Sequence, residues 1–168
     1  MAQTSPAEET RLVDSLLHTN FKRVVVGAFC GACSGVLLLA LSTLFTPPEA
    51  NKLWWIQLMA SMCSGGQALS FDLTKSVLVS GLFVHFGFSV LNGLIFGKMT
   101  TSSKMSRLMG YGLVLGGLCW LASNMFAPDF LSVEALNGLA QWTRVFLFVT
   151  FGVSIGFFMS IASKALKV

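Results

Sequence analysis

Four runs of apolar residues, each about twenty residues long, constrain this chain more than any other feature of its sequence. They cover residues 24–46, 76–97, 108–127 and 145–163. An α-helix rises about 1.5 Å per residue, so about 20 residues cross the roughly 30 Å hydrocarbon core of a bilayer. Once these runs are removed, no stretch long enough for a soluble domain remains. The sequence therefore predicts an all-α integral membrane protein, a bundle of four spanning helices.

Composition and charge support this class and exclude another. Hydrophobic residues make up 54% of the 168 residues and charged residues only 11%, which is too little charge for the surface of a soluble domain. The formal net charge of +4 could suggest nucleic acid as a partner. However, the basic residues stand singly or in pairs beside the apolar runs, as membrane topology requires. We therefore expect the lipid bilayer as a partner, and no nucleic acid.

The first 22 residues form a segment of different character, ahead of a membrane domain that covers residues 23–168. Ser5 and Glu8 have the spacing of a capping box, with Pro6 at the first helical position. Apolar residues then recur at helical spacing, at Leu12, Val13, Leu16, Leu17 and Phe21. The pattern predicts a short amphipathic helix on the cytoplasmic membrane surface. The alternative is a disordered tail.

A fifth apolar stretch, residues 53–71, has to be placed either across the membrane or beside it. With four spans and a cytoplasmic N-terminus, eight of the eleven basic residues lie inside, and the positive-inside rule is met. The inner ones are Arg11, Lys22, Arg23, Lys98, Lys104, Arg107, Lys164 and Lys167, and the outer ones are Lys52, Lys75 and Arg144. A fifth span would abolish this bias. We therefore expect both termini in the cytoplasm and residues 53–71 as an outer interfacial or re-entrant helix.

The four tryptophans fall toward the predicted outer face. Trp54 and Trp55 begin the fifth stretch, and Trp120 and Trp142 lie near the outer ends of the last two spans. Tryptophan is enriched at membrane–water interfaces, so all four are predicted to be interface anchors.

The spans also resemble one another. Residues 82–89 read LFVHFGFS and residues 147–154 read LFVTFGVS, an offset of 65. At an offset of 81, the first span aligns with the third, so that Gly31 and Gly35 match Gly112 and Gly116. This pattern predicts two hairpins in parallel repeat, related by an axis along the membrane normal. Chance similarity between glycine- and phenylalanine-rich helices is the alternative.

Glycines are spaced for close helix contacts. Gly27, Gly31 and Gly35 form one GxxxGxxxG face, and Gly112 with Gly116 forms another GxxxG. Helices in lipid associate through close backbone approach, which small residues permit. We expect these glycines at helix–helix contacts, within the chain or in a homo-oligomer.

One polar stripe crosses the second span. His85, Ser89 and Asn92 share a helix face near the middle of the apolar run. Polar groups at that depth face protein or water and are functional candidates. The stripe could line the path of a small oligomeric transporter or channel, or His85 could bind haem, with a second His85 from a dimer partner. The third possibility is that His85 is neutral and bonds to a neighbouring helix as a packing contact.

Other chemical signatures are weak or missing. Cys30 and Cys33 have CxxC spacing, but they lie within the first span near its inner end, where thiols act as small packing residues. We recognise no nucleotide-binding loop, nucleophile elbow or zinc-protease motif. The sequence thus predicts no catalytic residues, no metal site and no enzyme, and no cofactor other than the haem already considered.

The chain resembles the small four-span bacterial membrane proteins related to YagU. The resemblance rests on the glycine-rich first span, the stretch 53–71, HFGFSVLNGLIFG in the second span and GYGLVLGG in the third. It implies this architecture and a bacterial inner membrane. Separately from the resemblance, the sparse polar chemistry, the glycine faces and the short loops lead us to expect an accessory or interaction subunit of a larger membrane complex.

Overall fold

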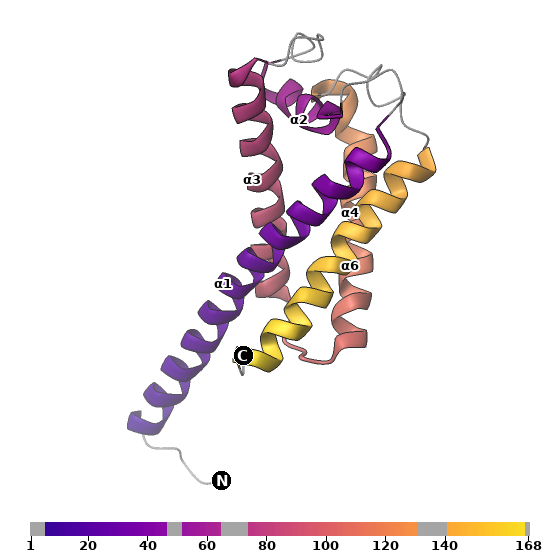
Figure 1. Cartoon of the computed structure of the whole chain (residues 1–168). Coiled ribbons are helices and arrows are strands. Elements are labelled where there is room, and N and C mark those ends of the chain that lie inside the picture. Colours follow the sequence, from indigo (N-terminus) through magenta and orange to yellow (C-terminus); the bar gives the residue numbers. More distant parts are fainter. Residues whose placement is uncertain (1–5, 47–51, 65–73, 131–140, 167–168) are drawn as a thin grey trace.

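The computed structural model describes residues 6–46, 52–64, 74–130 and 141–166 of the chain. Within them every regular element is an α-helix, which confirms the predicted all-α class (Figure 1). The helices are α1 (Pro6–Leu44), α2 (Trp54–Ser64), α3 (Lys75–Met99), α4 (Met105–Phe130) and α6 (Gln141–Leu166).

Four of these helices are long and apolar enough to cross a membrane. The candidate spans are Asn20–Leu44, Lys75–Met99, Met105–Met125 and Gln141–Leu166. Each lies within four residues of the predicted span at both ends. The chain is therefore a multi-pass membrane protein by the length and composition of its helices.

Helix α1 differs from the prediction for the N-terminal segment. It is one unbroken helix of 39 residues, which is about 58 Å at 1.5 Å per residue. Figure 1 shows its indigo end continuing the axis of the apolar part beyond the other helices. Residues 6–22 are thus helical as predicted, but they do not form a separate helix. Ser5, the predicted cap, lies outside the described residues.

The spanning helices pack as two close pairs. Helix α1 lies against α3, helix α4 lies against α6, and contact between α1 and α6 joins the pairs. A Cβ added to Gly27 or Gly31 would overlap the α3 backbone at Gly93, and one added to Gly112 would overlap the α6 backbone at Gly152. Only glycine allows these backbones so close together, and such approach drives helix association in lipid.

The glycines singled out in the sequence lie at helix contacts within the chain. Gly35 lies against the side chains of Ser89 and His85, and Gly116 lies against the backbone at Phe148. The sequence analysis missed the partner glycines on the facing helices. Gly93 with Gly97 and Gly152 with Gly156 are themselves GxxxG pairs, which was the signal that could have found them.

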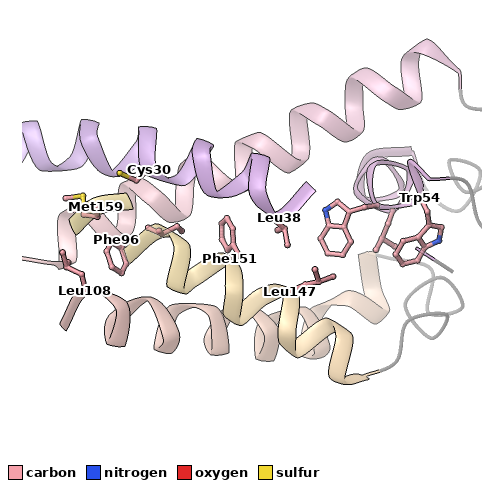
Figure 2. Packing of buried hydrophobic residues seen from close by; sticks show 11 residues of the cluster. Cys30, Leu38, Trp54, Phe96, Leu108, Leu147, Phe151 and Met159 are labelled. Atoms are coloured by element: carbon pink, nitrogen blue, oxygen red, sulfur yellow. The ribbon is translucent and has the colours of Figure 1, made fainter. Parts of the chain in front are cut away.

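The apolar core runs along the bundle between the four long helices, and α2 closes one end (Figure 2). Phe96, Leu108 and Met159 lie toward one end of it, Phe151 lies in the middle, and Trp54 lies at the α2 end. We call the end where α3 ends and α4 begins the Arg23 end, and the opposite end the α2 end.

Helix α2 is embedded in the protein, which corrects the prediction for its tryptophans. It packs on α3, and its residues Trp54 to Leu58 are all buried. Trp55 is only 4% exposed and meets the ring of Phe148 edge-on, with 6.4 Å between the ring centroids. Trp55 therefore points into the bundle instead of outward as an anchor, and Trp54 is buried beside it. Residues 65–71 of the predicted outer helix lie outside the described residues.

The helix pairing agrees with two hairpins. The offset of 81 equates two contact glycines, Gly31 and Gly112, but the offset of 65 between the second and fourth spans does not match their contact faces. An offset of 65 equates Gly87 with Gly152. Gly152 touches α4, whereas a Cβ on Gly87 would meet nothing within 4 Å. An offset of 59 instead equates Gly93 with Gly152, and both are contact glycines. The internal duplication itself stays a prediction.

Candidate functional site: a buried polar cluster between three helices

The predicted polar stripe is buried on one face of α3. His85 is 2% exposed and Ser89 0%, and Asn92 is also buried. This face looks toward α1 because Gly35 leaves room there: Ser89 and the His85 ring occupy the space that a Cβ at position 35 would need. The structure therefore brings the three predicted residues together, inside protein.

Both ring nitrogens of His85 bond to other helices. The indole Nε1–H of Trp55 on α2 donates to Nδ1, with 3.2 Å between the nitrogens. Because an indole nitrogen can only donate, Nδ1 must accept, and the ring proton lies on Nε2. Nε2 then donates to the backbone carbonyl of Gly35 on α1, at 2.9 Å. Trp55 thus selects one neutral tautomer of His85, and that tautomer ties α1, α2 and α3 together.

The side chains of Ser89 and Asn92, the other two residues of the stripe, donate hydrogen bonds to backbone carbonyls of α3 itself. Ser89 Oγ donates to the carbonyl of His85 at 2.8 Å. Asn92 Nδ2 donates to the carbonyl of Phe88 at 2.9 Å, and Asn92 Oδ1 accepts from Cys119 Sγ on α4 at 3.3 Å. Ser and Asn side chains inside helices commonly bond to a carbonyl one turn earlier in this way. The stripe thus links α3 to α1, α2 and α4.

This geometry determines what His85 can do chemically. A haem iron could bind His85 only by displacing either the Gly35 carbonyl or the Trp55 indole. A transported solute could reach the stripe only if the helices around it moved apart, because His85, Ser89 and Asn92 are all buried. As it stands, the cluster has the arrangement of a packing contact. Its sequence signal was incomplete, because nothing in the pattern around Trp55 marked it as a partner of His85.

The cysteines are reduced, and their surroundings differ. Cys30 is buried in the core and Cys63 is exposed, while Cys33 and Cys119 are partly buried. Cys119 is a donor in the polar cluster. Among the described residues, no group of three or more His, Cys, Asp or Glu side chains comes together as a metal site would require.

The remaining two tryptophans lie outside this cluster. Trp142 is 82% exposed near the start of α6, a position open to lipid or solvent. Trp120 on α4 is partly buried, and its Nε1 is covered and has no hydrogen-bond partner.

Two arginines also carry an enclosed nitrogen without a partner. They are Arg23 near one end of the bundle and Arg144 near the other, and in both the atom is Nε. Sequence reasoning placed both only as topology signals. Comparisons of the chain with protein-family models, with curated proteins and with solved structures find no match.

Proposed function

We propose that this protein is a non-enzymatic integral membrane protein that serves as an accessory subunit, docking through α4 onto a partner in a larger membrane complex. The observation that carries the proposal is the outward face of α4. Gly110, Val114, Gly117 and Leu121 recur at i, i+4, i+7 and i+11. At about 100° per residue they lie opposite the contact glycines Gly112 and Gly116.

No other part of the described structure covers this face, and two of its four residues are glycines. A Cβ added to Gly110 or Gly117 would meet nothing within 4 Å, and the side chains of Val114 and Leu121 are exposed. The glycines on the other side of α4 hold α6 at backbone distance. A second glycine-bearing face suits the same kind of contact with a helix from outside the chain, because close approach of backbones is what stabilises helix association in lipid.

The buried cluster supports an interaction role over transport or redox chemistry. The polar atoms of His85 and Asn92 are already engaged between helices of this chain. A subunit whose polar groups serve its own packing leaves its apolar outer faces for partners. No cofactor enters this proposal.

The membrane and the orientation are part of the same proposal. Lys98, Lys104, Arg107 and Lys164 all lie at or next to the Arg23 end, where α3 and α6 end and α4 begins. The positive-inside rule then favours that end, with both termini, on the cytoplasmic side. The resemblance to YagU-related proteins favours a bacterial inner membrane.

The test is affinity purification of the protein in a gentle detergent, with mass spectrometry and an absorption spectrum on the same sample. We expect a stoichiometric partner to be retained and the sample to be colourless. The double variant G110I/G117I should lose the partner while the protein remains folded. The matched control is Gly87→Ile, since Gly87 is also an outward glycine with open space, but on α3.

Three outcomes would count against the proposal. Equal loss of the partner in the Gly87 control would show that the α4 face is not special. Retention of only a second copy of this chain would replace the accessory role with a homo-oligomer. A saturable transport activity of the protein alone in liposomes, abolished by His85→Ala, would favour the transporter alternative.

A further inference from the structure

We infer that Arg23 forms a binding site for a phosphate group, as carried by an anionic lipid headgroup, at the Arg23 end of the bundle. The inference starts from how the guanidinium is held. Arg23 Nη1 donates to the carbonyl of Thr100 at 3.0 Å, which links α1 to the residue that caps α3. Nε is enclosed and has no hydrogen-bond partner. The Nη1 side of the guanidinium is thus fixed to protein. The N–H of Nε is a donor that no described protein atom uses.

The Thr100 anchor is itself rigid. Thr100 is buried, its backbone N–H donates to the carbonyl of Phe96 at 3.0 Å, and its Oγ1 donates to the same carbonyl at 2.7 Å. The backbone of Arg23 lies against Gly97, where a Cβ could not fit. The position and orientation of the guanidinium are therefore set by its contacts with α3 and the Thr100 cap, and no acidic side chain that the structure describes takes part.

The described side chains around Arg23 carry charge of one sign. Five further cations, all exposed, lie beside Arg23 on α1, at the ends of the other helices or on the α3–α4 connection: Lys22, Lys98, Lys104, Arg107 and Lys164. Among residues whose side chains the structure describes, none at this end is acidic. A ligand that satisfies Nε must bring oxygen acceptors, and the field of these cations favours a negative one.

A phosphate group meets these requirements. The planar arginine fork binds phosphate through two parallel N–H···O bonds. Anionic leaflets supply phosphate at the depth where spanning helices end, and basic pockets between helix ends bind such headgroups. A soluble phosphate compound would offer the same chemistry, so the experiment must separate the two sources.

Arg144 provides an internal comparison. Its Nε is likewise enclosed and unpartnered, but among the described residues its guanidinium makes no hydrogen bond like the one from Arg23 to Thr100. The other cations described at that end are Lys52, just before α2, and Lys75, at the start of α3. Arg144 therefore has the unused donor without the anchor and the surrounding charge.

The experiment titrates the full-length protein, in nanodiscs of phosphatidylcholine, with phosphatidylglycerol, and follows the thermal midpoint and the retained lipid by native mass spectrometry. A parallel arm adds inorganic phosphate in place of the anionic lipid. The variants are Arg23→Gln, Arg23→Lys, Lys98→Gln and Arg144→Gln. Arg23→Lys keeps the charge, and its binding decides the result if Arg23→Gln fails to fold.

The site predicts that Arg23→Lys binds phosphatidylglycerol roughly tenfold more weakly than the unmodified protein, since a hydrogen bond to a charged group is lost. Lys98→Gln should lose no more than roughly fivefold, the contribution of one surface charge. Arg144→Gln should bind as the unmodified protein does. An Arg23-dependent effect of phosphatidylglycerol alone identifies a lipid site, and the same effect of inorganic phosphate identifies a soluble ligand. Equal binding by Arg23→Lys and the unmodified protein would overturn the inference, as would equal losses in Arg23→Gln and Arg144→Gln.

Discussion

The α1–α3 pair and the α4–α6 pair use the same kind of contact, yet they present different surfaces. In each pair facing glycines bring the two backbones together, Gly31 against Gly93 in one and Gly112 against Gly152 in the other. The first pair is additionally tied by His85, whose ring bonds to both α1 and α2. In the second pair, the side-chain hydrogen bonds of Ser123 and Ser154 go to carbonyls of their own helices.

The difference shows what each kind of contact contributes. Among the described residues, α4 and α6 are held by the glycine contacts and by apolar packing around Leu108 and Ile155, so close packing is sufficient to make a pair. Lipid tails are as apolar as leucine, so there is no hydrophobic drive between the helices, and packing has to supply the association. The polar cluster adds a different contact: the hydrogen bond from Trp55 to His85 ties α2, which is too short to cross the membrane, to the end of the first pair.

The same difference separates a closed side of the molecule from an open one. The first pair has α2 on one side and α6 on another. Helix α4 has its main contact with α6 and turns a glycine-bearing face outward. A docking face is therefore expected on the second pair and a rigid scaffold on the first.

The largest expected effect comes from filling either glycine contact. Gly93→Leu and Gly152→Leu should each lower the free energy of unfolding by about 3 kcal/mol, because the new side chain meets backbone that cannot move aside. Reversible unfolding in mixed micelles would measure this. Gly93→Leu should also change the tryptophan fluorescence of Trp55, since α2 packs on α3, whereas Gly152→Leu should do so less.

The control for this comparison is Gly87→Leu. Position 87 opens onto empty space, so the free energy of unfolding should stay within about 0.5 kcal/mol. If Gly87→Leu were as destabilising as Gly93→Leu, the loss would reflect helix propensity or lipid contact, and the glycine contacts would not be what holds the pairs.

The fold was predictable where the physics is local and repetitive. Runs of about twenty apolar residues have one stable solution in lipid, and the span ends follow from their length. The GxxxG spacing at Gly27–Gly31 and Gly112–Gly116 identified two of the four contact faces for the same reason: a period of four residues places small side chains on one side of a helix.

The site was predictable only in part, because it depends on contacts far apart in the sequence. The polarity of His85, Ser89 and Asn92 marked them as one buried face. Their partner Trp55 lies thirty residues earlier, and a tryptophan after a polar turn is equally typical of an interface anchor. The offset of 65 between the second and fourth spans misses the contact faces for a related reason, since the LFVxFGxS match aligns residue types while the contact faces follow Gly93 and Gly152.

The second prediction concerns the polar tie that distinguishes the first pair. Trp55→Phe should cost about 1 kcal/mol, because it keeps most of the buried ring but leaves Nδ1 of His85 without a donor. A double-mutant cycle with His85→Phe should give a coupling free energy of similar size. Trp142→Phe, at an exposed position, is the matched control and should leave the free energy of unfolding unchanged. Additive effects of Trp55→Phe and His85→Phe would mean that α2 is held by its apolar contacts alone.

The smallest expected effect tests whether the two pairs are coupled through polar contact at all. Cys119 Sγ donates to Asn92 Oδ1 across α4 and α3, and a thiol is a weak donor. Cys119→Ala should therefore lower the free energy of unfolding by about 0.5 kcal/mol, while Cys119→Ser, which keeps a donor, should change it less. Cys63→Ala, at an exposed cysteine, controls for general effects of removing a thiol. If alanine and serine at position 119 behaved alike, the contact between α1 and α6 would be what joins the pairs. The α4–α6 pair would then be free to adjust to a partner without disturbing the cluster around His85.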